Sequence, residues 1–417
     1  MPPATPLELD FGVDWWTLLR DPAYLRDPYP ELKRIRELAP IHYDPVTGIY
    51  FILGHREFGL VARAPEMGRD TRLWATGWHS SENKEKDPLG YELFREFQPQ
   101  MTNANPPDHR RMRAVYESAF RPAYLARFAA MIAAESHLLL DGIQHGESAD
   151  FMTAFANLLP RRVTRNMFHM APDMDDQLAQ WVAALSLIGN VIMTPEQKQQ
   201  AHKALREFKE YLRRHLADFR RLPEEGFLAI AIAASAEGIM DEEESLNNLV
   251  TLIAGGTATL TLLGNGLFTL LRHPETFMKL RNDRTLLPSA IEEMLRYEPG
   301  SSMILRAAIR DFPIEGIRIP AGALAIGLVG AIHRDPTCFA NPDSFDIARH
   351  PNPHFVFGAG PHICLGKAVV RMTAEAAFTA LMDRFPALEL VGEPTWWVER
   401  SDQRGLHHLP VLFGSRN

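Results

Sequence analysis

One cysteine, Cys364, lies in a loop with glycines at 358, 360 and 366, and a helix-forming segment follows the loop directly. The thiolate is the form of cysteine that binds metals, and the N–H groups and positive dipole end at a helix start lower a thiol pKa. Glycine permits tight loops and close backbone approach, and Phe357 is expected to shield the sulfur. A lone cysteine is more often buried and inert, but the whole pattern predicts a thiolate presented to a metal.

The ten residues FGAGPHICLG, 357–366, have the form Phe-x-x-Gly-x-x-x-Cys-x-Gly. This pattern resembles the haem-binding loop of the cytochrome P450 family, the haem-thiolate monooxygenases. The resemblance implies a haem b cofactor with Cys364 as the proximal iron ligand, and it places Phe357 and Gly366 beside the haem. Electron donation by a thiolate ligand favours O–O cleavage.

Four basic residues match the family's contacts to the haem propionates. His109 and Arg113 lie four apart and so share one face of a predicted helix. Arg306 and His362 match the remaining propionate ligands. Without the resemblance, His109 and Arg113 are equally well explained as part of a basic surface helix. Together the four side chains would balance two buried carboxylates, which are otherwise costly.

The segment AGGTAT, 254–259, resembles the family's oxygen-binding segment, in which a small pair precedes an acid and an alcohol. The downstream Gly-Asn-Gly at 264–266 also resembles family sequences and sets the register. Thr257 then occupies the place of the acid and Ala258 that of the catalytic threonine. A shift of one residue makes Thr259 the alcohol but leaves Ala258 in the acid position. The candidate oxygen-activation residues are Gly255, Thr257, Ala258 and Thr259.

Because the acid is missing in either register, proton delivery must follow another route. Three hypotheses remain open: a water chain anchored on Thr257 or Thr259, a hydroxyl or carboxylate of the substrate, or hydrogen peroxide as the oxidant. Tight helix packing by small residues also explains the segment.

Glu293 and Arg296 are three apart on one helix face. Most such pairs are solvated and contribute little. The family's Glu-x-x-Arg pair interlocks with a further basic residue before the cysteine loop, and Arg349 matches it. We expect these three residues to support the haem face without a chemical role.

The remaining pattern is mainly helical. A polar stretch at 68–107 is expected to be an irregular binding loop, and one long helix, opened by a capping pair, is expected over 241–272. Other expected helices cover 31–38, 195–221 within a helical region 122–222, and 291–297; expected strands cover 41–43, 49–53, 312–326 and 406–413.

The resemblance covers about 27–411 and implies a mainly α fold with small β sheets, the triangular cytochrome P450 fold. We expect residues 1–417 to form a single catalytic domain, with a small β-rich N-terminal region, because no linker divides them.

Composition limits the other classes of function. Hydrophobic residues make up 46% and charged residues 23%, as in ordinary globular chains. The only other cysteine, Cys338, is read as packing filler, so no disulfide framework is expected and a cytoplasmic location is favoured. A net charge of −8 argues against general nucleic-acid binding. The uncharged stretch 246–271 is long enough to span a membrane, but its asparagines, glycines and threonines favour a central helix of a large protein.

The expected reaction is insertion of one oxygen atom from dioxygen into a small apolar or aromatic molecule, by hydroxylation or oxidative dealkylation. Electrons are expected from an external ferredoxin and its NAD(P)H-dependent reductase, since the chain shows no flavin or iron–sulfur segment. The alternatives are a peroxide-driven haem oxygenase and a non-catalytic haem ligand sensor.

The sequence also suggests which residues contact the partner and the substrate. The expected ferredoxin-docking residues are Arg110, Arg111, Lys367 and Arg371. The expected substrate walls are 68–101, 185–193, 250–258 and 303–305, including Trp78, Met193, Met303 and Ile304.

Overall fold

The computed structural model describes residues 6–190, 193–219 and 226–414, and helices dominate it. The longer helices are α3 (Tyr29–Leu38), α4 (His55–Arg63), α6 (Pro88–Phe97), α7 (Asp108–Glu117), α9 (Ala129–Asp141), α10 (Leu158–Met167), α11 (Asp175–Ser186), α12 (Pro195–Phe219), α13 (Phe227–Ala236), α14 (Glu242–Ala254), α15 (Thr257–Arg272), α16 (Pro274–Asn282), α17 (Leu287–Tyr297) and α19 (Lys367–Arg384). Shorter helices are α1 (Trp15–Leu18), α2 (Pro22–Arg26), α5 (Ser81–Lys86), α8 (Pro122–Leu125) and α18 (Val329–Ile332).

The strands are β1 (Ile41–Asp44), β2 (Ile49–Ile52), β3 (Met67–Gly68), β4 (Glu147–Asp150), β5 (Met303–Ala308), β6 (Phe312–Ile314), β7 (Ile317–Ile319), β8 (Leu324–Leu328), β9 (Ala387–Leu390), β10 (Thr395–Trp396), β11 (Leu406–His408) and β12 (Pro410–Gly414). The predicted strand regions at 41–43, 49–53, 312–326 and 406–413 are confirmed. β4 and β9 were not predicted from the sequence; they pair with β12 in a three-stranded sheet.

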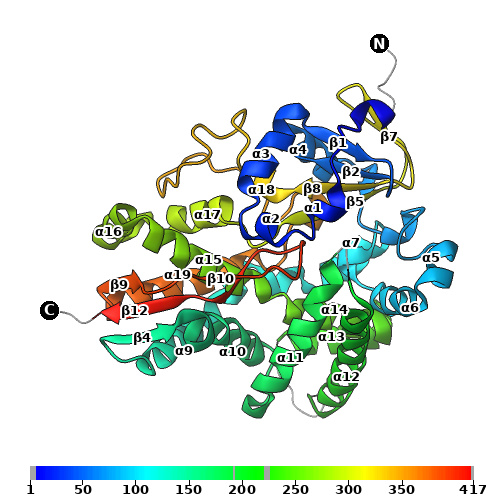
Figure 1. Cartoon of the computed structure of the whole chain (residues 1–417). Helices are drawn as coiled ribbons and strands as arrows, with labels where there is room; N and C mark the ends of the chain where they lie inside the picture. Colours follow the sequence, from blue (N-terminus) through cyan, green and yellow to red (C-terminus); the bar gives the residue numbers. More distant parts are fainter. Residues whose placement is uncertain (1–5, 191–192, 220–225, 415–417) are drawn as a thin grey trace.

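The largest sheet joins segments that are far apart in the chain, in the order β1-β2-β8-β5-β3. Figure 1 shows the blue strands β1 and β2 beside the yellow β8. β8 is buried along its whole length, as expected for a central strand covered on both faces. It pairs in parallel with β2 and antiparallel with β5, where Arg306 lies opposite Ala325. The sheet therefore holds the buried Arg306 in the interior.

The helices α14 and α15 contribute Leu249, Leu263 and Leu267 to a large hydrophobic cluster, which also contains residues of α6, α9, α10 and α19 and is here called the main hydrophobic cluster. The predicted capping pair is confirmed: Asp241 accepts a hydrogen bond from the Glu244 backbone N–H at 2.8 Å, and Glu244 accepts one from the Asp241 N–H at 3.1 Å. The prediction of one unbroken helix to Arg272 is wrong at Gly255 and Gly256, where ψ is −7° and −15° instead of the helical value of about −42°. Glycine costs stability inside a helix, and here two in a row separate α14 from α15.

Replacing Asp241 with alanine is expected to lower the free energy of unfolding by about 1 kcal/mol, because it removes one half of this capping box. The measurement is the urea unfolding midpoint of the variant against wild type. An unchanged midpoint would show that the first turn of α14 is held by other contacts.

The prediction that 68–107 is irregular is wrong, because the stretch contains α5 and α6. Ser80 caps α5, and Asp87 caps α6, which has Pro88 at its first position. These are ordinary helix-start residues. α6 buries Leu93 and Phe94 against the main cluster, so its apolar face outweighs the polar composition of the stretch.

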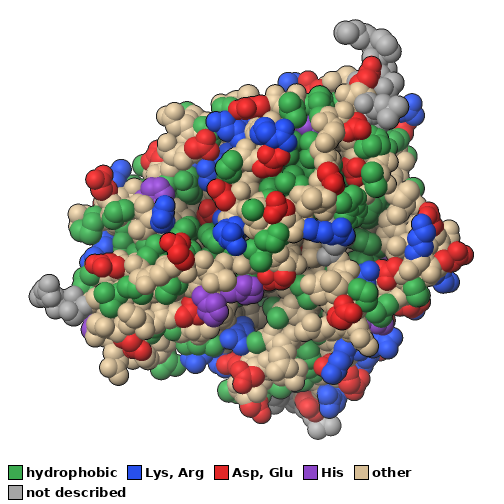
Figure 2. All heavy atoms as spheres, viewed as in Figure 1, with side chains coloured by type: hydrophobic (Ala, Val, Ile, Leu, Met, Phe, Trp, Pro, Cys, Tyr) green, Lys and Arg blue, Asp and Glu red, His purple; other side chains and the backbone are tan. Residues whose placement is uncertain are grey.

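The predicted charged helix 195–221 is confirmed as α12 through Phe219; residues 220 and 221 lie outside the described residues. Figure 2 shows acidic and basic side chains interspersed over the region of α12, at the lower right. Arg213 forms ion pairs with Glu242 and Glu243 at 2.7 and 2.8 Å. The opposite face of α12 buries Leu205, Phe208 and Leu212.

Two helical stretches of the described chain are long and apolar enough to cross a membrane by length and composition, Pro122–Asp141 and Glu242–Arg272. Such stretches are weak evidence, because the core helix of a soluble protein passes the same test. Just over half of the second window, 56%, is buried inside the protein.

Candidate active site around Cys364

The loop before α19 holds Cys364 by backbone contacts. The Cys364 N–H donates to the Phe357 carbonyl at 2.8 Å, which closes the loop on itself. Gly358 and Gly360 both have φ of +70°, a conformation that favours glycine. A Cβ at Gly360 would also lie 2.8 Å from the Ala62 carbonyl oxygen. The loop therefore requires glycine at these two positions.

Gly366 differs from the other two glycines of the loop. Its φ is −79°, which any residue adopts, and a Cβ there would meet only the Phe120 ring, at an ordinary contact distance of 3.9 Å. Glycine at 366 is thus not required by backbone strain.

Burial raises the pKa of the Cys364 thiol, while hydrogen bonds from the Gly366 and Lys367 N–H groups and the charge of Arg113 act in the opposite direction. The expected helix-start donors are present, but burial outweighs them. The prediction of a lowered pKa is therefore wrong for the chain without a metal. A metal cation deprotonates a coordinating thiol directly, so this donor set suits a cysteine that ionises on binding metal.

A cavity of about 400 Å³, here called the central cavity, opens beside Cys364. All seven residues predicted to bind the cofactor line it, although they come from α7, β5 and the cysteine loop. They are His109, Arg113, Arg306, Phe357, His362, Cys364 and Gly366.

The central cavity is basic on one side. The His109 and His362 rings lie 4.0 Å apart between their centroids. Burial and the neighbouring arginines lower the pKa of His362 to about 2 and that of His109 to about 4. Burial and then Arg69 lower the pKa of Arg306 to about 9. Burial is the largest cause of these shifts, and the positive side chains that lie close together add to it.

No aspartate or glutamate lines the central cavity within the described chain. A cofactor with two carboxylates would relieve the repulsion among these basic side chains, and a soft metal would suit Cys364. The residues present therefore fit haem, with its two propionates and its iron.

Arg69 also lines the central cavity, and no sequence pattern singled it out. It lies directly after β3, and its backbone N–H donates to the Asn105 side-chain oxygen at 2.8 Å. It lies within the expected substrate wall 68–101, but nothing in the sequence distinguishes it from the other residues of that wall, because its position depends on the pairing of β3 with β5.

The four candidate oxygen-activation residues, which lie at the junction of α14 and α15, do not all line the same cavity. Gly255 and Thr259 line the central cavity. Thr257 instead lines a different cavity, beside Glu399 and His407, and its hydroxyl donates to the Ala254 carbonyl at 3.1 Å. Ala258 packs against the main hydrophobic cluster. Of the two threonines, only Thr259 lies on the same cavity as Cys364.

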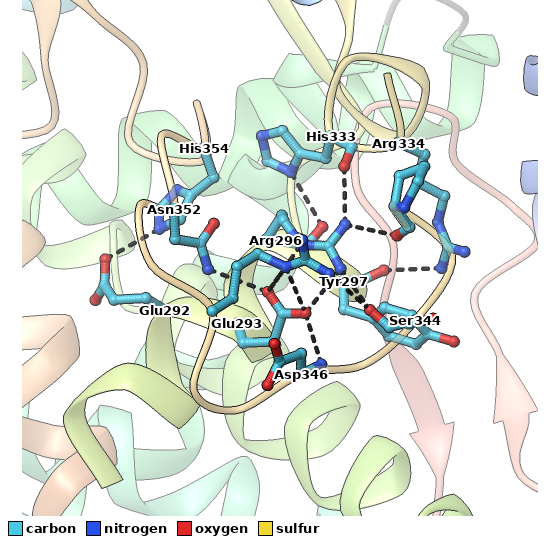
Figure 3. A network of polar contacts seen from close by, with 12 residues as sticks. Glu292, Glu293, Arg296, Tyr297, His333, Arg334, Ser344, Asp346, Asn352 and His354 are labelled. Atoms are coloured by element: carbon cyan, nitrogen blue, oxygen red, sulfur yellow. Dashed lines mark hydrogen bonds and ion pairs between the residues drawn. The ribbon is translucent and has the colours of Figure 1, made fainter. Parts of the chain in front are cut away.

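A buried ion-pair network supports the chain that leads to the cysteine loop (Figure 3). Glu293 and Arg296 are fully buried and form two hydrogen bonds of 2.8 Å. Arg349 donates to both Glu293 oxygens at 3.1 and 3.2 Å, which confirms the predicted triad. Asn352 also donates to Glu293, at 3.1 Å. The Glu293 carboxylate on α17 thus holds the segment that precedes Cys364 in place.

His333 adds a second connection to the same segment. Its Nε2 accepts from the Phe355 N–H at 2.8 Å, so its Nδ1–H donates to the Arg296 carbonyl at 3.2 Å. Burial lowers the pKa of His333 well below its usual value, which keeps this neutral tautomer. Glu292 binds Arg371 at 2.6 and 2.7 Å, and that guanidinium lies over the Phe357 ring at 4.6 Å.

The expected substrate walls are brought together in part. Met303 and Ile304 line the central cavity. Trp78 lines an adjoining cavity and also a further one, which it shares with Met193 and Trp74. Residues 191 and 192 of the expected wall lie outside the described residues.

The expected docking residues differ in availability. Arg111 pairs with Glu244 at 2.6 Å, and Arg371 is held by Glu292. Arg110 and Lys367 form no ion pair with any part of the chain that the structure describes. Only these two remain available for an external acidic partner.

Comparison with known proteins yields consistent matches. A family model for cytochrome P450 matches residues 76–395. The biotin biosynthesis cytochrome P450 of Bacillus subtilis (strain 168) is 31% identical over 399 residues, covering 94% of this chain and 97% of that protein. The structure of P450BioI with a hexadec-9Z-enoic acid ligated acyl carrier protein superposes with a TM-score of 0.85 at 29% identity, covering 94% of this chain and 100% of that one. Myxobacterial cytochrome P450 CYP267B1 with myristic acid gives 0.86 at 27% identity, covering 96% and 100%.

Proposed function

The chain belongs to the cytochrome P450 family of haem-containing monooxygenases, and from that premise we propose that it inserts one oxygen atom of dioxygen into a small apolar or aromatic organic molecule. The reaction class is hydroxylation or oxidative dealkylation. The observation that carries the proposal is the central cavity, which combines Cys364 with a group of basic side chains and no described acid.

In this proposal each part of the cavity has one task. Cys364 would ligate the iron, and His109, Arg113, Arg306 and His362 would hold the propionates. The bound haem would supply the oxygen-activating chemistry, and the thiolate would donate electron density to it. Met303 and Ile304 exclude water from one wall, as apolar side chains do. Gly255 leaves room beside the helix for small molecules, because it has no side chain.

Thr259 is the proposed anchor for water that delivers protons. It lines the central cavity, and its hydroxyl has no hydrogen-bond partner among the described residues. The Thr257 hydroxyl is already donated to a backbone carbonyl and lies on another cavity. Thr257 and Ala258, which stand where the family's acid and threonine are usual, are thus not the proposed proton route.

Electrons are proposed to come from a ferredoxin and its NAD(P)H-dependent reductase, with Arg110 and Lys367 as part of the docking surface. A cytoplasmic location suits such partners. The relatives solved with a carrier-bound fatty acyl chain and with myristic acid support an elongated apolar substrate as one possibility within the proposed class.

The first experiment is a titration of the ferric protein with aromatic ethers and acids, terpenoids, steroids, fatty acids and macrolide-like compounds, followed by the haem Soret band. A saturable blue shift, together with NAD(P)H consumption that depends on the same compound, supports the proposal. Soret shifts without any substrate-dependent NAD(P)H consumption, in the presence of a competent ferredoxin, would favour a haem ligand sensor.

Replacing Thr259 with valine is expected to reduce ferredoxin-driven turnover by about 10- to 100-fold, because proton delivery of this kind contributes roughly 100- to 10,000-fold and water can replace part of it. Turnover driven by hydrogen peroxide, which brings its own protons, is expected to change by less than about threefold. Replacing Thr257 with valine is the matched control and should leave both rates near wild type. A larger loss in the Thr257 variant would contradict the assignment.

A peroxide-driven oxygenase is the second candidate, because the family's acid is replaced by Thr257. Wild-type turnover that is faster with hydrogen peroxide than with ferredoxin and reductase would favour it.

A further inference from the structure

A second cavity of about 380 Å³, here called the side cavity, adjoins the central cavity. The two share Arg69, Thr102, Thr251 and Arg306 among their lining residues. One wall of the side cavity is apolar: Phe94 and Phe97 of α6 line it with Trp78, whose ring stacks on Phe94 at 4.3 Å between centroids. The side cavity is therefore cationic at one end and aromatic along one wall.

Arg69 and Arg306 meet at a single acceptor. Arg69 Nη1 donates to the Leu305 carbonyl oxygen at 3.2 Å, and Arg306 Nη1 donates to the same oxygen at 2.9 Å. The other contact of the Arg69 guanidinium is a 3.3 Å hydrogen bond from Nε to the Thr102 carbonyl. Burial lowers the pKa of Arg69. Two guanidinium groups thus converge where the protein offers only neutral oxygens.

Two acids, one next to Arg69 in the chain and one on the side cavity, are already engaged by other side chains. Asp70, the next residue in the chain, accepts hydrogen bonds from Arg72 at 2.6 Å and from Gln98 at 3.2 Å. Asp402, the one acid on the side cavity within the described residues, is paired with Arg400 at 2.8 and 2.9 Å. No described carboxylate forms an ion pair with Arg69.

Four basic side chains other than Arg69 are already assigned to the haem propionates. His109, Arg113, Arg306 and His362 provide donors for two carboxylates on the central cavity. None of His109, Arg113 and His362 lines the side cavity, whereas Arg69 lines both cavities. The Nη2 atom of Arg69 donates to no described residue, so the guanidinium group retains a donor for a further anion. Arginine forks match carboxylates in a bidentate geometry.

We propose that Arg69 binds the carboxylate of the substrate, and that the substrate class is an apolar or aromatic carboxylic acid whose body lies along the Trp78–Phe94 wall. This inference rests on the proposed function, whose substrate it narrows to acids. Arg69 is then a specificity-determining residue that touches the substrate.

The test compares acids with their uncharged amides in the haem-loaded protein. The probes are tetradecanoic acid with tetradecanamide, and 2-naphthoic acid with 2-naphthamide, each titrated by the Soret band and by calorimetry. At least one acid is expected to bind wild type about 10- to 100-fold more tightly than its amide, the range given by a hydrogen-bonded charge in a buried site. Arg69→Gln is expected to remove this difference by weakening the acid and leaving the amide unchanged.

Two further variants separate the explanations. Arg72→Gln is the matched control, because Arg72 lies in the same segment but pairs with Asp70 and lines neither cavity. It should bind the acids as wild type does. Arg69→Lys should retain part of the preference for acids, since lysine keeps the positive charge but cannot bind a carboxylate in the bidentate geometry of a guanidinium group.

Three results would overturn the inference: no preference for acid over amide in wild type, equal weakening of both by Arg69→Gln, or loss of haem from that variant. The last would assign Arg69 to a propionate. These binding measurements do not depend on turnover. A protein that oxidises neutral compounds but shows no acid preference would contradict this inference alone, whereas acid binding without any oxidation would contradict the proposed function alone.

Discussion

Replacing Cys364 with alanine is expected to abolish the long-wavelength carbon-monoxide band of the reduced protein. Ferredoxin-driven turnover is expected to fall by more than about 100-fold, because loss of a residue that only supports a metal ligand already costs about 10- to 100-fold. The reason is that the alanine variant has no thiolate to donate electron density to the iron. Since the four basic side chains on the central cavity remain, the variant is expected to retain part of its haem.

Cys338 provides the matched control, because it is the other free cysteine and lies outside the central cavity. Cys338→Ala should keep the band and the turnover of wild type. A normal carbon-monoxide band in Cys364→Ala would mean that another group ligates the iron, and it would remove the basis for the assigned site.

Replacing Glu293 with glutamine is expected to destabilise the protein by about 3–5 kcal/mol, the usual cost of removing one partner from a buried ion pair. Arg296 is fully buried and would lose its counter-charge, and Arg349 and Asn352 would lose one of the two Glu293 oxygens that accept their hydrogen bonds. Because those contacts fasten the segment before Cys364, the yield of haem-loaded protein should fall as well. The measurements are the unfolding midpoint and the haem content per chain.

Glu31→Gln is the control, since Glu31 forms the same three-residue pair with Arg34 on the surface, at 2.6 Å. An exposed pair contributes less than about 1 kcal/mol, so this variant should unfold near the wild-type midpoint. Turnover per bound haem should be unchanged in the surviving Glu293→Gln protein. A specific loss of turnover with normal stability would contradict the purely structural role assigned to Glu293.

Much of the site was predictable because its determinants are local. The cysteine loop, the four-residue spacing of His109 and Arg113, and the three-residue spacing of Glu293 and Arg296 each occupy one short segment. Backbone geometry at Gly358 and Gly360 follows directly from residue type. The family, the mainly helical fold and the haem cofactor are confirmed, whereas a single catalytic unit over 1–417 stays a prediction.

The features that were not predicted correctly depend on contacts between segments that are far apart in the sequence. Arg69 faces the cavities because β3 pairs with β5, about 240 residues further along the chain. The polar stretch 68–107 forms α6 because Leu93 and Phe94 find the main cluster. The Cys364 pKa is raised by burial that only the packed structure creates. None of these effects is visible in residue types or spacing alone.

The most direct test of the central claim is mass spectrometry of the product formed under ¹⁸O₂, with ferredoxin, reductase, NAD(P)H and the compounds that shift the Soret band. A cytochrome P450 monooxygenase acting through the Cys364 site predicts one ¹⁸O atom in each hydroxylated product molecule, and at least about 100-fold less product from Cys364→Ala. A hydroxylated product that carries oxygen from water, or no product from any bound compound in a protein with a normal carbon-monoxide band, would contradict the account.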